Sequence, residues 1–230
     1  MTVWTLALET VATAGSVALL SDGEIRSQQQ LPLESRSART LTTAIHDLWE
    51  AADKPKISLV TVASGPGSFT GLRVGVTTAK TLAFAWGAKL IGVNTLDAIA
   101  AQVPTSDCTL HVVLDAQRKE LFLATYRTSS GRWQRQAADT IIAAQSWLDS
   151  LASAPADANP IVAGPALNKL HNRVPANVVC SDPSTWHAQA ATIGHLAHLA
   201  NLAGGADELW SLAPHYLRVS YAEEKRTEAH

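Results

Sequence analysis

The chain has 230 residues, with 18 Lys+Arg against 20 Asp+Glu and a formal net charge of −2. A hydrophobic share of 47% with 17% charged residues supports a sizeable core and excludes an intrinsically disordered chain. The near-neutral charge argues against an autonomous nucleic-acid binder, which usually carries a basic face. Two cysteines without CxxC spacing exclude a disulfide framework and fit a reducing compartment.

The first twenty residues are not expected to be a signal peptide. They carry no basic segment at their start, and Glu9 interrupts the apolar run. No stretch of about 20 residues is free of charges and helix breakers, so we expect no membrane span. We therefore predict a cytoplasmic protein without membrane contact.

The first thirty residues are predicted to form a meander of three antiparallel strands. Apolar residues alternate along the first strand, and Asp22-Gly23 is a strong turn signal between the second and third. The three strands are predicted over residues 3–8, 16–20 and 24–31.

Helices and strands alternate after the meander. A helix with Ser37 as its N-cap is predicted, because apolar positions recur at helical spacing at Ala38, Leu41, Ile45, Leu48 and Ala52. The later elements are a strand at 57–63, a loop at 64–71, a helix at 69–86 ended by Gly87, a strand at 90–93 and a helix at 95–102.

This order of elements, βββαβαβα, is the pattern of a ribonuclease H-like half. The second half is predicted to repeat it more weakly, with strands at 110–114, 121–127, 133–142, 161–164 and 177–180 and helices at 145–151, 167–171 and 185–203. We therefore predict an α/β protein of two halves with mixed sheets. They are residues 1–104 and 105–230, with the 185–203 helix as a candidate to pack back on the first half.

The most unusual segment is a glycine-rich loop between a buried strand and a helix. Helix N-termini offer unpaired N–H groups, so such a loop is a common anion site. Neither a P-loop nor a dinucleotide fingerprint fits, because no Lys-Ser or Lys-Thr follows and Thr70 replaces the third glycine. A structural turn is therefore favoured over a phosphate cradle. The loop residues considered are Gly65, Pro66, Gly67, Ser68, Phe69, Thr70, Gly71 and Arg73. Ser68 and Thr70 are the candidate N-caps of the helix that follows.

The helix after this loop carries small residues on one face. At about 100° per residue, the face comprises Gly71, Val74, Gly75, Thr78, Ala79, Leu82 and Trp86. Small residues at four-residue spacing let another backbone approach closely. The face can pack on the chain's own sheet or on a neighbouring subunit, and the sequence leaves both alternatives open.

Several segments resemble the bacterial TsaB (YeaZ) family. The specific likeness is the run SGPGSFTGLRVG over residues 64–75, with Ala79, Leu82 and residues 91–96. Weaker likenesses are Leu8-Glu9-Thr10 with residues 16–19, the DAQRKE turn at 115–120 and the PHYLR segment at 214–218. The resemblance covers most of the chain.

The resemblance implies an actin-like (ASKHA) fold and a role in making threonylcarbamoyladenosine at position 37 of tRNA. Family members are not the catalyst: they pair with TsaD, which transfers the threonylcarbamoyl group, and the ATPase TsaE joins the complex. The N-terminal helical surface is expected to bind TsaD and to mediate homodimers. We place this interface at Leu41, Ile45, Gly71, Val74, Gly75, Thr78, Ala79 and Leu82. Binding of tRNA is expected only through the complex, and ATP or ADP only at the complex interface.

Two departures from the family pattern stand out. Glu9 occupies a position where relatives usually have Asp, which weakens any phosphate- or metal-related role there. A solvated strand end is the favoured interpretation of Glu9 with Thr10. Relatives commonly have His in the segment matching residues 36–39, and this chain has none.

Other candidate residues favour structural interpretations. Asp115 with Arg118 can be a functional pair in the second half, although a surface ion pair in a turn is favoured. His187, His195 and His198 lack the converging ligands of a metal site. No metal site, peptidase motif or complete nucleophilic catalytic set is predicted.

The alternative hypothesis is an ATP-using actin-like phosphotransferase or small-molecule kinase. The glycine loop at the strand-to-helix junction motivates it. Such enzymes need acidic Mg²⁺ ligands near both phosphate-binding turns, and only Glu9 and Asp115 are candidates.

Overall fold

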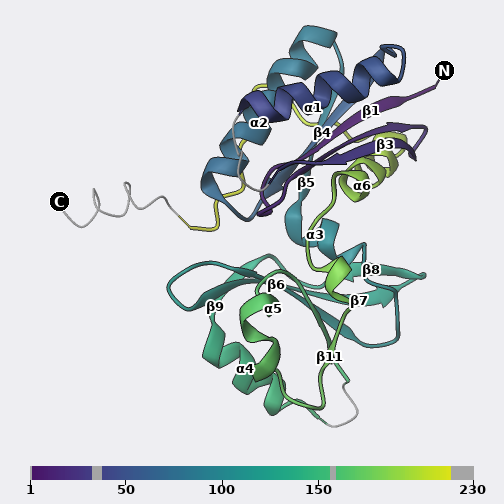
Figure 1. Cartoon of the computed structure of the whole chain (residues 1–230). Coiled ribbons are helices and arrows are strands. Elements are labelled where there is room, and N and C mark those ends of the chain that lie inside the picture. The colour runs from purple at the N-terminus through teal and green to yellow at the C-terminus, as the bar shows by residue number, and fades with distance from the viewer. Residues whose placement is uncertain (1, 33–37, 156–158, 219–230) are drawn as a thin grey trace.

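A computed structural model describes residues 2–32, 38–155 and 159–218. The chain forms two lobes, one above the other in Figure 1. In the upper lobe β1 (Trp4–Glu9), β2 (Ser16–Ser21) and β3 (Glu24–Gln30) form the predicted meander. They are followed by α1 (Ala38–Ala51), β4 (Ile57–Gly65), α2 (Phe69–Trp86), β5 (Lys89–Asn94) and α3 (Thr95–Ala100). The sequence prediction of these elements is confirmed, although the N-cap candidate Ser37 lies outside the described residues.

The first sheet has the order β3-β2-β1-β4-β5. The meander pairs are antiparallel, whereas β1–β4 and β4–β5 are parallel. Side chains alternate between two helical layers, as strand geometry requires. Leu6 and Leu8 pack in the core with α1 and α2, while Ala7 packs with Ala190 and Ala191 on the other face. Layers on both faces explain why β1 and β2 are almost wholly buried.

The second lobe repeats this topology. Its strands are β6 (Thr109–Asp115), β7 (Glu120–Ser129), β8 (Arg132–Arg135), β9 (Thr140–Ala143), β10 (Ile161–Ala163) and β11 (Val179–Cys180). Its helices are α4 (Ala144–Ala152) and α5 (Leu167–Leu170). The sheet order β11-β10-β6-β7-β8 mirrors that of the first lobe, with the same parallel and antiparallel pairs. This duplication defines two ribonuclease H-like halves with mixed sheets, as predicted.

The single strand predicted over 133–142 is in fact two strands. β8 pairs with the far end of β7, and β9 pairs with residues 120–123 of the same strand. Arg135 pairs with Tyr126 and Thr140 pairs with Leu123, so five residue steps here span only three on β7, and the extra residues must leave the sheet. Asp139 in this break accepts a hydrogen bond from Asn94 Nδ2 at 2.7 Å.

The last helix, α6 (Ala190–Leu202), begins five residues later than predicted. Residues 183–185 form a separate 3₁₀ turn, and the following residues cross from one lobe to the other. The backbone N–H of Ala190 is satisfied by Ser16 Oγ at 2.9 Å, so a residue distant in sequence caps this helix. α6 packs on β1 and β2 of the first lobe. Residues 204–212, assigned above to the second half, also return there: Asp207 pairs with Leu90.

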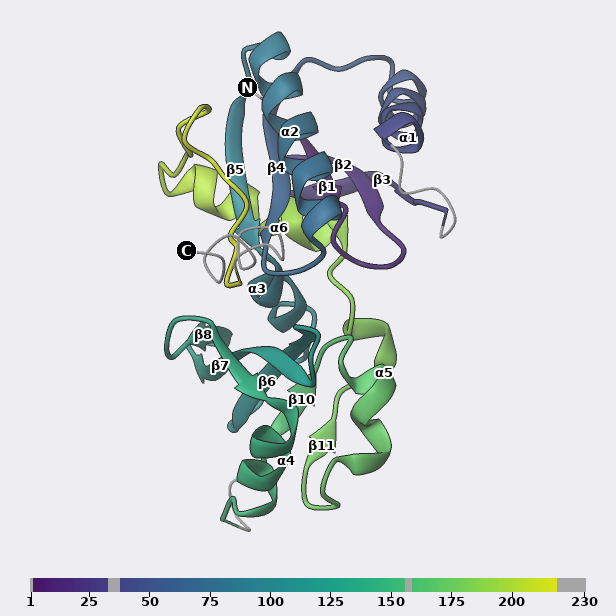
Figure 2. The same cartoon turned by 90° about the vertical axis from the view of Figure 1, so that its left-hand side faces the viewer.

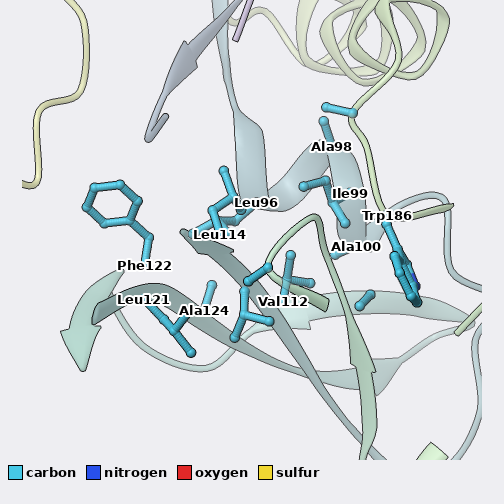
Figure 3. Close-up of a cluster of buried hydrophobic side chains, with 14 of the residues drawn as sticks. Leu96, Ala98, Ile99, Ala100, Val112, Leu114, Leu121, Phe122, Ala124 and Trp186 are labelled. Carbon is cyan, nitrogen blue, oxygen red and sulfur yellow. The ribbon is translucent and has the colours of Figure 1, made fainter. Parts of the chain in front are cut away.

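The two lobes share a continuous apolar core through α3. Leu96 and Ile99 of α3 belong to the same cluster as Leu114 and Leu121 of the second sheet. Figure 3 shows these side chains meeting, with Phe122 at one end and Trp186 at the other. The lobes are therefore held together around α3. No helix in the described part of the chain is long and apolar enough to cross a membrane.

The second lobe contains a partly buried histidine, His111, that makes the stability of the protein depend on pH. Burial lowers the pKa of the His111 imidazole, and Trp147 Nε1 donates to His111 Nδ1 at 3.3 Å. A histidine whose pKa is lower in the folded state binds its proton mainly in the unfolded state. Its stabilising contribution is present above the unfolded value of about 6.5 and is lost as the pH falls below it.

We therefore expect the free energy of unfolding to fall between about pH 7 and about pH 5, and His111→Gln to make that fall shallower. Urea denaturation at several pH values measures both slopes. The pKa of His187 is also lowered by burial, so some dependence should remain in the variant. Equal slopes in the variant and the original protein would remove His111 from this explanation.

Candidate functional site between the lobes

A cavity of about 1080 Å³ lies between the lobes. The first lobe contributes the β1–β2 turn, the glycine loop and α3. The second contributes the turn after β6 and residues of α5. Glu9, the glycine motif, Thr95, the 115–120 turn and the PHYLR segment, all from stretches that resemble the TsaB family, therefore reach one site although they are far apart in sequence. The lining residues from these segments include Glu9, Val11, Gly67, Phe69, Arg73, Asp115, Arg118, Lys169, Tyr216 and Arg218.

The glycine loop and α2 form a cradle for the β1–β2 turn. A Cβ atom at Gly67 would collide with Val11, and Cβ atoms at Gly71 and Gly75 would collide with Thr10. Thr10 Oγ1 also donates to the carbonyl oxygen of Gly71 at 2.8 Å. Glycines at positions 67, 71 and 75 thus share one task, which is to let residues 10 and 11 approach the helix. This packing accounts for the small-residue spacing of the motif.

The loop also begins α2 in the way that the sequence suggests. Ser68 is the N-cap, and its side chain accepts from the N–H of Gly71 at 3.4 Å. Of the two predicted cap candidates, Ser68 rather than Thr70 has this role. Gly65 has a φ of 115°, which L side chains rarely adopt. The structural alternative for this loop is therefore favoured by geometry, because Val11 fills the space against Gly67.

Glu9 closes the neighbouring turn. Its side chain is fully buried, and Oε1 accepts from the backbone N–H groups of Val11 at 2.6 Å and Ala12 at 2.9 Å. Backbone N–H groups in such turns are the donors that phosphates use. Here the chain's own carboxylate occupies them. Glu9 is thus a buried structural residue, and the expected interpretation of a solvated strand end is wrong.

The strap, residues 207–218, completes the cavity wall and was not foreseen as a structural unit. Tyr216 stacks on Phe69 with ring centroids 4.8 Å apart, and its hydroxyl accepts from Arg73 Nε at 3.2 Å. Arg73 also lies 4.0 Å from the centre of the Phe69 ring. Figure 2 shows the strap in yellow, descending beside β5 toward the second lobe. The PHYLR resemblance was the only sequence signal for these contacts.

The predicted turn of the second half faces the same cavity. Asp115 accepts from Lys169 Nζ of α5 and from the N–H of Gln117, both at 2.7 Å. Burial raises the pKa of the Asp115 carboxyl, but these donors outweigh burial and leave the pKa below its ordinary value. Gln117, Arg118 and Lys119 all have positive φ angles, between 54° and 64°. Asp115 thus has Lys169 as an ion-pair partner, which the sequence did not predict.

Five of the eight residues expected at a partner interface are buried inside the first lobe. They are Leu41, Ile45, Gly71, Gly75 and Ala79. In the chain by itself these five pack against its own sheet and the β1–β2 turn, and their contact with a partner stays a prediction. Their burial follows from the cradle and from the packing of α1 on β2. The other three, Val74, Thr78 and Leu82, are partly exposed along α2.

The histidines do not gather into a metal site. Across residues 2–32, 38–155 and 159–218, no group of three or more His, Cys, Asp or Glu could hold an ion. His198 is buried and packs against the Gly23 turn, whereas His187 lines the cavity between the lobes. Residues 36 and 37, where the family's His is missing, lie outside the described residues.

The duplicated lobes and the cleft between them define the class: an actin-like (ASKHA) protein. A model of the family described as TsaD: tRNA N6-adenosine threonylcarbamoyltransferase matches residues 33–217. A Bacillus subtilis protein called tRNA threonylcarbamoyladenosine biosynthesis protein TsaB is 27% identical over 97% of this chain and 98% of its own length. The Escherichia coli protein of the same name is 30% identical over 60% of this chain and 61% of its own.

A solved structure agrees with this assignment. YeaZ from Pseudomonas aeruginosa superposes with a TM-score of 0.77 at 25% identity, covering 94% of this chain and all of that one. The chain therefore belongs to the family of the matching model and, within it, to the TsaB (YeaZ) family.

Proposed function

We propose that this protein is a non-catalytic subunit in tRNA threonylcarbamoyladenosine biosynthesis that binds and stabilises a TsaD threonylcarbamoyltransferase. The names of its relatives supply the process. One observation supports the non-catalytic role: the Glu9 carboxylate takes the N–H groups of the β1–β2 turn, and Val11 fills the space against Gly67 of the glycine loop. The glycine motif then serves to build and position α2 rather than to hold a substrate.

The partner surface in this proposal lies along α1 and α2. A shallow groove beside the start of α2 is lined by Leu31, Leu41 and Val74, and partly exposed Thr78 and Leu82 continue the line. The same family model describes this chain and the threonylcarbamoyltransferases. A TsaD partner would therefore present helices equivalent to α1 and α2. The two subunits would then meet through corresponding surfaces, as the subunits of a two-fold symmetric dimer do. A second copy of this chain can use the same surface when TsaD is absent.

The remaining partners follow from the same proposal. The net charge of −2 gives no basic surplus, so tRNA contact falls to the other subunits. TsaE joins the assembled complex, and ATP or ADP binds only where subunits meet. The protein acts in the cytoplasm, where tRNA is modified.

We expect Thr78→Arg to weaken the complex with the cognate TsaD by roughly thirtyfold, the effect of losing about 2 kcal/mol at an interface hot spot. Thr78 is partly exposed, so the folded monomer should survive. Co-purification and analytical ultracentrifugation measure the loss. Thr140→Arg, at an exposed threonine of β9, is the matched control and should leave the affinity unchanged.

Two outcomes would defeat the proposal. The first is no complex with TsaD at micromolar concentration, with or without nucleotide. The second is micromolar binding of ATP-Mg²⁺ by the isolated protein in isothermal titration, which would favour the phosphotransferase alternative. Equal effects of Thr78→Arg and Thr140→Arg would keep the partner but move the interface elsewhere.

A further inference from the structure

The strap is firmly attached to the first lobe. The N–H of Asp207 donates to the carbonyl oxygen of Leu90 at 2.8 Å. Lys80 Nζ of α2 donates to the carbonyl oxygens of Trp210 and Leu212 at 3.0 and 2.9 Å. With the Tyr216 stack, these contacts fix the strap along α2 and β5 down to the cavity. Residues 207–216 of the strap are therefore packed on the first lobe as part of it.

The end of the strap crosses to the second lobe. Arg218 donates to the carbonyl oxygen of Ala116 at 2.7 Å and pairs with the Glu120 carboxylate. His215 Nε2 lies 3.5 Å from Asp139 of the second lobe. The Arg218 and Glu120 side chains are 20% and 37% exposed. These crossing contacts are polar and partly hydrated, in contrast to the apolar packing around α3.

The covalent links between the lobes lie together and form a hinge. The chain crosses after α3 and again before α6, and Gln102 ties these crossings together. Its Nε2 donates to the carbonyl oxygens of Thr185 and His187 at 3.1 and 2.8 Å, and its Oε1 accepts from the N–H of Gln189 at 3.0 Å. Because α3 packs on both sheets, we expect any movement of the lobes to be a rotation about this region.

We propose that the strap is a releasable clasp that sets how far the cavity between the lobes opens. Arg218 holds the turn after β6 against a strap that is fixed to α2, so the glycine loop and the Asp115–Glu120 turn stay at a set distance. When the Arg218 contacts break, the second lobe rotates about α3 and the cavity widens. The clasp contacts are ionic and partly exposed, so salt weakens them more than it weakens the hinge.

Pulsed electron paramagnetic resonance tests the clasp. Spin labels are placed at exposed Thr77 of α2 and exposed Thr140 of β9, in full-length protein with Cys108 and Cys180 replaced by serine. We expect Arg218→Met to shift the distance distribution to longer values and to broaden it. Glu120→Gln removes the partner charge from the other lobe and should produce the same shift. At high salt, the protein without a strap substitution should also show a distance distribution shifted toward longer values.

Lys169→Met is the matched control because it breaks an ion pair with Asp115 on the same cavity wall, but within one lobe. It should leave the distances unchanged. The proposal would be overturned if the distance distributions of both Arg218→Met and Glu120→Gln superimposed on that of the unsubstituted protein. A shift caused equally by Lys169→Met would also overturn it, since any lost charge on the wall would then have the effect. Thermal unfolding by circular dichroism verifies that each variant is folded.

Discussion

Gly75→Ala is expected to lower the free energy of unfolding by about 2–3 kcal/mol, the upper part of the range for overpacking a well-packed core. An added Cβ would collide with Thr10 Oγ1 and would lie 3.2 Å from Val62 Cγ2. Alanine is otherwise the better helix former, by about 1 kcal/mol, so a loss of stability must come from the collision. Urea denaturation measures it.

A double-mutant cycle isolates the contact. Thr10→Ala removes the hydroxyl and its bond to Gly71, at a cost of about 1 kcal/mol. The double variant should lose less stability than the sum of the single variants, because the colliding atom is gone. Thr77→Ala, on the exposed side of the same helix, should be neutral or slightly stabilising. Strict additivity at positions 10 and 75 would refute the cradle.

The same geometry changes how substitutions on this helix are interpreted. Gly75→Arg appears from the sequence to be a probe of a partner interface, because glycine lies on the small-residue face. The structure places that position against Thr10 and Val62. We expect Gly75→Arg to prevent stable folding, so the loss of TsaD binding in that variant would say nothing about an interface.

Glu9→Ala is the second substitution with a large expected effect, a loss of about 2–4 kcal/mol. The change leaves the N–H groups of Val11 and Ala12 without their acceptor in a partly buried turn, and hydrogen bonds to a charged group contribute about 1.5–3 kcal/mol each. The change also removes the desolvation cost of a buried carboxylate, and this gain offsets part of the loss.

Glu9→Gln keeps a side-chain carbonyl oxygen of the same reach, so its cost should be less than half as large. Chemical denaturation of the two variants gives the comparison. If both lose the same stability, the charge and not the acceptor geometry is what the turn requires. If neither variant loses stability, Glu9 does not stabilise the turn.

Particular residues show how far prediction could go. Alternating apolar positions and the Asp22-Gly23 signal were enough for the meander, because strand periodicity is local. The break in the 133–142 strand depended on two pairings with one edge of β7, which no local pattern encodes. The late start of α6 depended on Ser16, which is 174 residues away from Ala190.

The candidate site divides in the same way. Spacing identified positions 71 and 75 as places of close approach, since glycines four residues apart lie on one helix face. The spacing could not show which group approaches these glycines, and the structure shows that it is the β1–β2 turn of the same chain. Glu9 resembled an exposed strand end because a lone carboxylate is usually solvated. Only folding brings it onto two backbone N–H groups.

The sequence by itself determined the two-half α/β architecture, the glycine-rich loop and the TsaB family, because periodicity, turn residues and a twelve-residue motif are local properties. The tertiary structure alone decided which surfaces are free. It buried Leu41, Ile45, Gly71, Gly75 and Ala79, assembled segments distant in sequence around one cavity and carried residues 207–218 back across both lobes. These outcomes depend on contacts between residues far apart in the chain, whose entropic cost is repaid only when the whole core forms.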